Sequence, residues 1–518
     1  MSEATSTGTQ SARTLLFFKP TRKTIILLLA FFLLCGIGVR MIDFTDLPLD
    51  FAATRQLRSL IIARGLYYQM DTPNTTTMPQ DIRHFGINAG NNESIIEPPI
   101  MEYMTAYVYR IMDHENILVS RTLAILFWVA GGIPIFLLAR KIMDLNGSFA
   151  ALAAYLFTPF GVFASRSFQP EALMILFILW ALHFQITWAQ EENLKNAILA
   201  GLFTGLAVFV KAPAAFFVGF PFAWLVLSKG VKSLKQPTIF LMAALALLPA
   251  ILFNAVSATV GGNAGAIFGT RFFPELFTDI DWYSRWLRMI RSVVGYFPFI
   301  IGLLAFCLIK KRQDRGFYIS MWLAYLLYGF VFAYHIYTHN YYHLPLVPII
   351  ALAIGYLFSL FFSKLEAINT ARLPRAAILF VSFFSLLLCA QVTRGTLIQS
   401  EYRHEAQYWA SLGEKIGHNA SVIALTHDNG YRLSYWGIVS PQQWPTAGDR
   451  TIKSLVGASD PDFIQLFKEL TLGKQYFLVT LMGEFDSQPD LKEYLYSHYP
   501  YEQGDGFILF DLIHPLNL

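Results

Sequence analysis

The sequence predicts a polytopic α-helical membrane protein with about eleven transmembrane helices and a small C-terminal α/β domain. Two observations on composition and length support this fold class. The chain of 518 residues is 55% hydrophobic and 14% charged, whereas soluble globular domains are roughly 25% charged. Many of its apolar runs are about 18 to 22 residues long, the length that a helix needs to cross a hydrocarbon core of about 30 Å. This composition excludes an ordinary soluble protein.

The apolar runs follow one another from near Lys23 to the start of the tail. The first run has no small-residue cleavage site behind it, so we expect a retained helix and not a removed signal peptide. Cys35, Cys307 and Cys389 all lie inside apolar runs, which indicates neither disulfides nor a thiolate metal site. The predicted spans lie at about 24–42, 118–139, 148–165, 171–189, 196–210, 213–228, 237–256, 293–309, 317–335, 344–362 and 376–394.

The connections between the spans predict the topology. Every second connection is short and rich in Lys and Arg, apart from the turn with Glu191, Glu192 and Lys195. Short basic connections mark the cytoplasmic side of a membrane. The N-terminus is then cytoplasmic, and an odd number of spans places the tail outside. We expect a plasma membrane, and the compact loops favour a bacterial one. The predicted domains are a cytoplasmic tail at 1–23, a transmembrane module at 24–394 with its first outer loop at 43–117, and an extracytoplasmic α/β domain at 395–518.

Three segments on the outer side are predicted to be helices that lie in the membrane interface. Residues 50–68 place Leu and Ile on one side and Arg elsewhere, which is an amphipathic pattern. A second helix is expected to start at Glu97, because the two following prolines suit a first helical turn. The third, 274–291, carries Trp282 and Trp286 as interfacial anchors.

The tail alternates short β-rich runs with helical patterns and has ordinary charge. The runs SVIALT, QYFLVT and GFILFDL are typical strands, and 403–417 and 460–470 have helical periodicity. We therefore predict a small soluble α/β domain.

Carboxylates after the first span are candidates for a general base. Asp43, Asp46 and Asp50 lie there, and we favour Asp50 because it begins the predicted helix 50–68. The alternative is that Asp50 caps that helix by accepting hydrogen bonds from its first N–H groups. The two roles are not exclusive, and Asp43 or Asp46 would be the base if Asp50 is not.

A second group of carboxylates belongs to later outer segments. Glu171 starts the fourth span directly after Pro170, where it could act in a site or only complement the helix dipole. Glu97 could join the same acidic cluster or face water, and we expect Glu102 to face water. Two acidic groups that reach one interface from separate loops favour a site.

Several cations have positions suited to an anionic ligand. Lys211 interrupts an apolar run, and an ionisable residue at that depth is a functional hypothesis by default. Its alternative is a lysine that snorkels to the headgroups. His335, His339 and His343 are four residues apart, so a helix would align them for phosphate contact or metal ligation. Arg285, Arg288 and Arg291 are expected to meet anionic headgroups.

These segments together resemble the GT-C superfamily of lipid-phosphate-sugar-dependent glycosyltransferases. The branch in question contains protein O-mannosyltransferases and the aminoarabinose transferase of lipid A. The resemblance runs over most of 24–394 and rests on five motifs in order. They are TDLPLDFAATRQLRSLIIARG, EPPIMEYMTAYVY, SRSFQPEAL, GLAVFVK and HNYYHLPLVP.

The resemblance implies an inverting glycosyltransferase that moves a sugar from a polyprenyl-phosphate donor to a lipid, glycan or protein acceptor. It implies Asp50 as catalytic base and Glu171 as its acidic partner. Some members use a divalent metal, which Asp50 and Glu171 would then hold. Glu97 stands where some relatives have Lys, a departure that weakens lipid A as the acceptor. The expected substrate-binding residues are Arg55, Arg58, Glu97, Arg166, Lys211, His339, Tyr342 and His343.

Two other functions stay open at this point. A lipid-linked-sugar transporter or flippase also needs many spans, but transporters show internal repeats and ionisable groups at mid-membrane. Here the polar candidates gather at one predicted face, with His183 the main exception. A non-catalytic membrane subunit is the third possibility. The net charge of +4 and the absence of a Gly-rich phosphate loop indicate no nucleic-acid or nucleotide partner.

Overall fold

The computed structural model describes residues 19–94, 97–259, 271–366, 372–455 and 462–516. Within them the chain forms two compact units, which are treated separately below. The helical unit comprises Met1–Phe44, Ile95–Ile100 and Arg121–Gln399. The sheet unit comprises Thr45–Ser94, Met101–Ser120 and Ser400–Leu518. The first outer loop is thus grouped mainly with the C-terminal tail.

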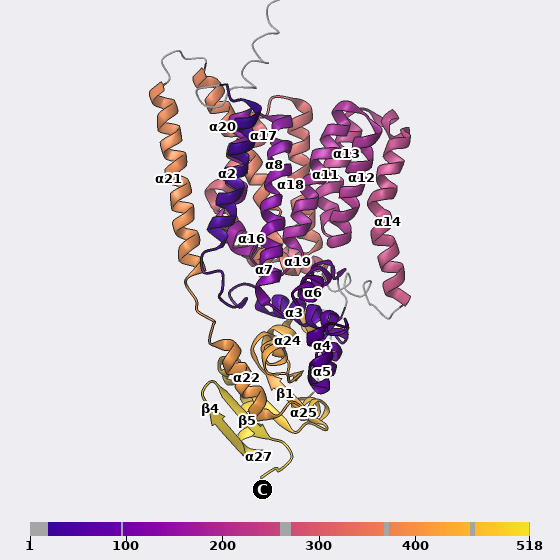
Figure 1. The fold of residues 1–518 in the computed structure, drawn as a ribbon, viewed down its shortest axis with the longest axis vertical. Helices are drawn as coiled ribbons and strands as arrows, with labels where there is room; N and C mark the ends of the chain where they lie inside the picture. The colour runs from indigo at the N-terminus through magenta and orange to yellow at the C-terminus, as the bar shows by residue number, and fades with distance from the viewer. Residues whose placement is uncertain (1–18, 95–96, 260–270, 367–371, 456–461, 517–518) are drawn as a thin grey trace, which may run out of the picture. The chain divides into compact units, whose positions relative to one another are not determined.

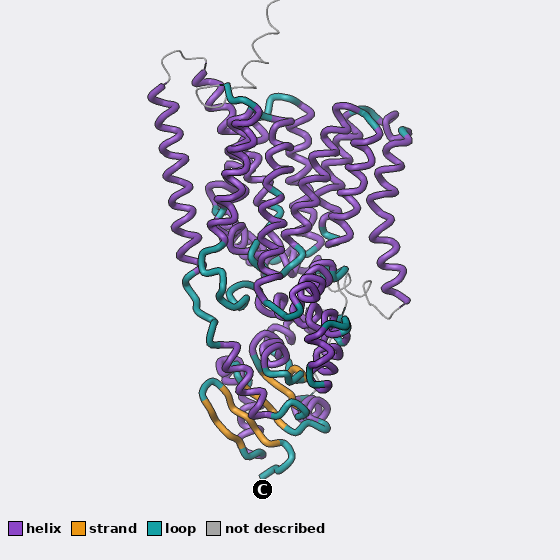
Figure 2. The backbone as a smooth tube through the Cα atoms, viewed as in Figure 1, coloured by secondary structure: helices purple, strands orange, loops and turns teal. Residues whose placement is uncertain are grey.

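The helical unit is a bundle of apolar helices (Figures 1 and 2). Each of the eleven predicted apolar segments coincides with one helix or with a pair of helices, which confirms the predicted fold class. The helices are α2 (Arg22–Arg40), α7 (Ile117–Ala130), α8 (Gly132–Ile142), α9 (Leu145–Phe157), α10 (Pro159–Ala164), α11 (Glu171–Glu191), α12 (Leu194–Val210), α13 (Ala214–Ser228), α14 (Pro237–Thr259), α16 (Ile280–Val294), α17 (Tyr296–Leu308), α18 (Arg312–Val331), α19 (Ala333–Thr338), α20 (Leu346–Glu366) and α21 (Arg372–Leu397), with short 3-10 turns η1 (Val231–Lys235), η2 (Pro274–Thr278) and η3 (Asn340–His343).

Many of these helices are long and apolar enough to span a membrane. Among the described residues, six continuous helical stretches meet both conditions. The bent pair α16 and α17, with an angle of 96° between its arms, makes up to seven. The helices α9, α12 and α13 are apolar but shorter. The chain is therefore a multi-pass membrane protein.

Two predicted spans are interrupted in the structure. The segment predicted as one helix over 148–165 breaks at Thr158, whose backbone is extended (φ −56°, ψ 122°). The cause is Pro159, because a proline ring excludes the preceding residue from the helical region. The span predicted at 317–335 likewise ends at Phe332 (φ −100°, ψ 48°), and the short helix α19 follows.

Close packing in the helical unit depends on small residues where helices cross. The helix α9 packs against α20, and α11 packs along α12. At the first crossing, a Cβ on Gly147 would lie 2.5 Å from the backbone oxygen of Gly355. Any larger residue would separate the two backbones, so this contact follows the small-residue rule for membrane helices.

The tail folds around a mixed five-stranded sheet of order β2-β1-β3-β5-β4. β1 pairs in parallel with β2 and β3, whereas β5 is antiparallel to both β3 and β4. The runs predicted as strands are β1 (Val422–Leu425), β3 (Tyr476–Val479) and β5 (Phe507–Asp511), and the predicted helices are α22 (Glu405–Ile416) and α25 (Phe463–Thr471). The elements not predicted are β2 (Gln442–Gln443), β4 (Tyr501–Gly504), η4 (His427–Gly430), α23 (Tyr431–Trp436), α24 (Ala447–Leu455), α26 (Met482–Asp486) and α27 (Pro489–His498).

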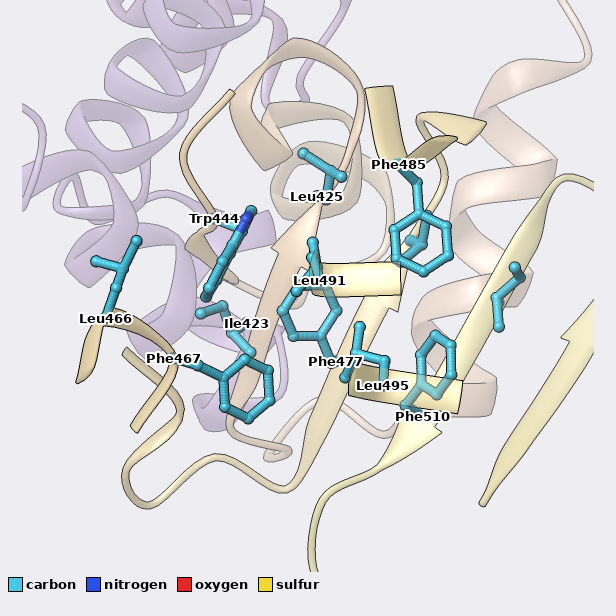
Figure 3. Close-up of a cluster of buried hydrophobic side chains, with 12 residues drawn as sticks. Ile423, Leu425, Trp444, Leu466, Phe467, Phe477, Phe485, Leu491, Leu495 and Phe510 are labelled. Carbon is cyan, nitrogen blue, oxygen red and sulfur yellow. The ribbon is translucent and has the colours of Figure 1, made fainter. Parts of the chain in front are cut away.

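The sheet has a hydrophobic cluster on each face. Figure 3 shows the larger cluster, in which Trp444 and Phe467 lie beside Ile423 of β1 and Phe477 of β3. The second cluster is built around Trp409 and Leu412 of α22. Both clusters bury the alternating residues of the central strands, which is why the short β-rich runs were recognisable in the sequence.

The first outer loop adds four helices to the sheet unit. They are α3 (Ala53–Tyr68), α4 (Pro73–Thr77), α5 (Gln80–Asn91) and α6 (Ile100–Met112). The helix predicted to start at Glu97 starts instead at Ile100, after both prolines. α3 and α5 pack closely, because a Cβ on Gly65 of α3 would lie only 3.0 Å from the Cα of Gly90 in α5.

Candidate functional site

A buried ion-pair cluster lies within the helical unit. Nζ of Lys211 is 3.3 Å from Oε1 of Glu97, and it also donates a hydrogen bond to Oε1 of Glu171. The side chains of Lys211 and Glu171 are 4% and 5% exposed, and that of Glu97 is 17% exposed. The structure therefore brings together three residues that the sequence analysis had singled out on separate segments.

Two of the three side chains are placed by helix ends, and the third lies in the segment before α6. Glu171 is the first residue of α11, where Pro170 precedes it in the cap position. Lys211 follows the last residue of α12, and its extended backbone (φ −158°, ψ 117°) turns the chain toward α13. Glu97 directly precedes Pro98, where the chain cannot continue in a helix.

The burial of Lys211 contradicts the alternative that it snorkels to lipid headgroups. A snorkelling ammonium leaves the apolar region for water, whereas this one is 4% exposed and faces two carboxylates. A charge taken out of water is tolerated only when it is paired and hydrogen-bonded. If both Glu side chains are ionised, the three charges sum to −1.

A small cavity of about 10 Å³ adjoins this cluster, which is close to the room that one water molecule needs. Its lining includes Glu171, Lys211, Tyr328, Tyr341 and Tyr342. Nζ of Lys211 lies 5.6 Å from the ring centre of Tyr342, within cation–π range. Oε2 of Glu171 is buried and makes no hydrogen bond within the described part of the chain.

Two of the cavity residues, Tyr328 and Tyr341, were not predicted to belong to the site. Tyr341 had a usable signal, because it is next to Tyr342 in the HNYYHLPLVP motif. Tyr328 had none, because it lies inside the apolar helix α18, where an aromatic residue is ordinary.

The three histidines do not share one helix, which corrects the predicted alignment. α19 ends at Thr338, and the backbone of His339 is extended (φ −127°, ψ 111°) before the turn η3 begins. The rings of His335 and His339 are still stacked, with centres 5.4 Å apart. His339 also lies 6.0 Å from the ring of Tyr342.

His343 is built into the interior of the bundle. It is fully buried, with Nδ1 2.6 Å from the hydroxyl of Tyr325 and Nε2 2.7 Å from the carbonyl oxygen of Ile336. The hydroxyl of Tyr325 also accepts a hydrogen bond from the indole of Trp286 (2.9 Å). This chain of bonds joins α16, α18 and the segment that carries His339. His343 therefore stabilises the segment that carries His339 through hydrogen bonds in the interior of the bundle.

Arginines surround the point where α2 ends. Arg166 donates a hydrogen bond from Nη2 to the carbonyl oxygen of Asp43 (2.7 Å), and Arg121 donates one to that of Phe44 (2.6 Å). Both arginines are 3% exposed. Guanidinium groups at a helix C-terminus suit its negative dipole end. Arg166 thus fixes the start of the acidic loop in addition to any contact with substrate.

Asp50, Arg55 and Arg58 belong to the sheet unit. Asp50 lies in a bend before α3, which begins at Ala53 and not at Asp50 as predicted. The cap residue is Ala52, in a left-handed conformation (φ 45°, ψ 49°) without a side-chain cap bond. The alternative in which Asp50 is the N-cap is therefore wrong.

The predicted substrate-binding arginines of α3 differ in their surroundings. Arg58 donates a hydrogen bond to Glu93 at 2.9 Å and another to the carbonyl oxygen of Ser94. Arg55 is half-buried in the first turn of α3. Glu102, which we expected to face water, is 9% exposed and accepts a hydrogen bond from Ser59 (2.7 Å). That expectation was wrong because α6 packs this side of its first turn inward.

Two further features bear on possible ligands. Within the residues described, no group of three or more His, Cys, Asp or Glu side chains is placed to hold a metal ion. A much larger apolar cavity of about 690 Å³ is lined by α2, α9, α17, α20 and α21, with Phe32, Phe149, Phe297 and Phe358 among its residues. A cavity of this size and polarity suits hydrocarbon chains.

Comparison with solved structures decides the fold. The chain matches ArnT from Cupriavidus metallidurans bound to undecaprenyl phosphate, with a TM-score of 0.56 and 14% identity over 93% of this chain and 97% of that one. It matches the oligosaccharyltransferase AglB from Archaeoglobus fulgidus, in complex with an inhibitory peptide and a dolichol-phosphate, with a TM-score of 0.58 and 12% identity over 94% and 74%. The chain has the GT-C fold.

Other comparisons agree with the GT-C fold. The mycobacterial arabinofuranosyltransferase AftD matches with a TM-score of 0.51 and 15% identity, over 89% of this chain and 35% of that one. Residues 96–253 match the family model of dolichyl-phosphate-mannose-protein mannosyltransferases. Curated protein sequences gave no match. The matched range contains Glu97, Arg166, Glu171 and Lys211, so the GT-C match covers the whole ion-pair cluster.

Proposed function

We propose that this GT-C protein is an inverting glycosyltransferase that uses a polyprenyl-phosphate sugar as donor. The observation that carries the proposal is the ion-pair cluster of a GT-C bundle, in which Lys211 and Glu171 are buried at helix ends and Glu97 pairs with Lys211. Buried ionisable groups in membrane proteins are costly and mark functional sites by default. The undecaprenyl phosphate of the ArnT structure and the dolichol-phosphate of the AglB structure support this class of donor.

The reaction needs a base and a site for a departing phosphate. The acceptor hydroxyl oxygen bonds to the anomeric carbon from the face opposite the donor phosphate, while the bond from that carbon to the phosphate oxygen breaks. Asp50 takes the hydroxyl proton, and the polyprenyl phosphate leaves with the bonding electron pair. Cationic and hydrogen-bonding groups stabilise the charge that develops on the phosphate. We assign this role to Arg55, Arg58, Arg166, His339 and Tyr342.

The ion-paired cluster has a separate part in this scheme. Lys211 orients Glu171 and Glu97, so that Glu171 can support the acceptor or the base. His343 contributes by holding the segment of His339 and Tyr342 in place. The acceptor is a lipid, a glycan or a protein, and the apolar cavity suits the hydrocarbon tail of a donor lipid. If a divalent metal takes part, Asp50 and Glu171 are the residues that would hold it.

We propose that the reaction takes place on the extracytoplasmic face of a bacterial plasma membrane, with the N-terminus in the cytoplasm. The alternation of basic connections supports this orientation. Membrane lipids are then the surroundings of the helical unit, and no nucleic acid takes part.

The test uses the purified protein in lipid with a panel of radiolabelled polyprenyl-phosphate sugars and a crude membrane acceptor. Wild type should consume one donor, and Asp50→Asn should lower the rate by at least about 10²-fold, the usual scale for a lost general base. Asp505→Asn, a change at an exposed aspartate of the β4–β5 turn, is the control and should keep full activity. Parallel reactions with a chelator determine whether a metal is needed.

Two outcomes would contradict the proposal. Full activity of folded Asp50→Asn would remove Asp50 as base and direct the test to Asp43, Asp46 and Glu171. Movement of labelled lipid between leaflets without donor consumption would replace the transferase with a flippase.

A further inference from the structure

The loop that carries Asp50 is held by side chains of the sheet unit. Asp46 is 3% exposed, and its Oδ1 accepts a hydrogen bond from the backbone N–H of Tyr402 (2.8 Å). Arg403 adds a bond from Nη2 to Oγ1 of Thr45 (3.1 Å). Tyr402 and Arg403 lie between the end of α21 and the start of α22. The tail thus holds the loop from a distance of more than 350 residues in sequence.

Gln56 holds the other side of the same loop. It is 1% exposed, and its Nε2 donates hydrogen bonds to the carbonyl oxygens of Pro48 (3.2 Å) and Phe51 (2.6 Å). These two carbonyls flank Asp50 in the chain. Leu49 and Phe51 are each 6% exposed, so the neighbours of Asp50 are packed while Asp50 itself is half-buried.

The backbone of the loop requires this support. Ala52 adopts the left-handed conformation (φ 45°), which an L-residue with a Cβ takes up only when its surroundings impose it. Directly before it, the bond from Gln56 to Phe51 fixes where the bend enters α3. A restrained loop keeps one carboxylate position, which is the requirement for a residue that must meet a substrate in a defined geometry.

The helix α3, which provides Gln56, is itself bound to the tail. Arg64 donates a hydrogen bond to the carbonyl oxygen of Tyr435 (2.6 Å), and its guanidinium carbon lies 3.9 Å from the centre of the Tyr435 ring. Arg64 also pairs with Glu115 at 2.9 Å. Nearer the loop, Thr54 donates to Oδ1 of Asp428 (3.2 Å), which in turn pairs with Arg432 at 2.5 Å.

We infer that Asp46 and Gln56 are positioning residues through which the C-terminal α/β domain and α3 fix the loop of Asp50. This rests on the proposed function in one respect only, the role of Asp50 as base. It gives the C-terminal domain a defined task, to keep that loop in one conformation. It also separates Asp46 from Asp50, since Asp46 acts through its hydrogen bond and not through its charge.

The inference predicts that Asn can replace Asp46 with little loss of activity, whereas the same change at Asp50 removes the base. Asp46→Asn keeps an amide oxygen that can accept from Tyr402, so its kcat should stay within about twofold of wild type. Asp46→Ala and Gln56→Met remove the hydrogen bonds and should lower kcat by about 10- to 100-fold, the cost expected for small misplacements. The KM for the donor should change less than about threefold in all variants, because none of them removes a group that is proposed to bind the donor. Gln69→Met, at the exposed end of α3, is the matched control.

Hydrogen exchange of residues 45–52 in the full-length protein provides a readout that does not depend on catalysis. Asp46→Ala and Gln56→Met should speed exchange in this loop, whereas Asp46→Asn and Gln69→Met should not. If Gln56→Met does not fold, the Asp46→Ala and Asp46→Asn pair decides alone.

Three results have distinct meanings. Equal loss of kcat in Asp46→Asn and Asp46→Ala would overturn the inference, because the charge and not the bond would then matter. Unchanged loop exchange in both Asp46→Ala and Gln56→Met would overturn it as well. If Asp50→Asn stays active while the loop exchange responds as expected, the proposed base fails and the restraint of the loop stands.

Discussion

Replacement of Lys211 by Met removes the only cation that the structure pairs with Glu171 in the described residues. Met has nearly the same length and is apolar, so the change leaves no large cavity and removes mainly the charge. Coulomb's law with an effective dielectric constant of about 20 gives about 5 kcal/mol of attraction for the 3.3 Å contact with Glu97. Removal of one partner of a buried pair costs about 3–5 kcal/mol in practice. We expect Lys211→Met to destabilise the helical unit by that amount.

The thermal midpoint of the protein in lipid nanodiscs measures the effect. Lys211→Met should lower the midpoint by several degrees, whereas Lys232→Met, at an exposed lysine of η1, should leave it within about 1 °C. The triple variant Lys211→Met, Glu171→Gln and Glu97→Gln should recover most of the loss, because no unpaired buried charge remains.

The recovery is the decisive part of this experiment. If the triple variant is as unstable as Lys211→Met, the destabilisation arises from lost packing and not from unpaired carboxylates. If Lys211→Met is as stable as wild type, the ion pairs contribute nothing measurable and the cluster cannot be the electrostatic centre of the site.

Three further changes test other parts of the structure. Burial and the charge of Arg432 lower the pKa of His427. The neutral ring therefore contributes stability that is present above the unfolded pKa of about 6.5 and is lost as the pH falls toward the lower pKa of the folded state. His427→Asn should weaken the pH dependence of hydrogen exchange in β1 below about pH 6.5. Gly65→Val should separate α3 from α5 and destabilise the sheet unit by about 1–3 kcal/mol, whereas Gly395→Ala, which has open space around it, should not lower the thermal midpoint. His343→Leu should cost about 1–3 kcal/mol because the hydroxyl of Tyr325 and the carbonyl oxygen of Ile336 both lose their hydrogen bonds to the ring. Full stability and activity of this variant would show that the buried hydrogen bonds do not support the His339 segment.

The fold was predictable wherever one physical requirement dominates. Apolar segments must be long enough to cross a membrane, so their positions were visible from hydropathy alone. The break at Thr158 was not foreseen, although Pro159 carried the signal, because the apolar run continues through it. The break at Phe332 has no comparable mark in the sequence, since no proline follows it.

Two candidate residues at the ends of spans lie close together in the structure, while their role in a site stays a prediction. Lys211 was singled out because charge is expensive within an apolar segment, and Glu171 because it starts a span at the outer face. The structure pairs these two residues. The exact helix start near Asp50 was missed by three residues. The buried position of Glu102 was also missed, since solvent exposure depends on contacts with Ser59 and other segments that periodicity does not report.

The structure also sharpens the question of what Lys211 does. A phosphate near Lys211 would add negative charge to a group of three that already sums to −1 with both carboxylates ionised. Lys211 could then stabilise a phosphate only if Glu97 or Glu171 moved away. The arrangement favours a lysine that neutralises carboxylates, which leaves phosphate binding to the arginines and to His339. Lys211→Arg distinguishes these roles. The larger guanidinium would meet Glu171 in a cavity of only about 10 Å³. If Lys211 orients the carboxylates, Lys211→Arg should therefore lower kcat and leave the KM for the donor unchanged. A rise in that KM would instead assign Lys211 to the phosphate.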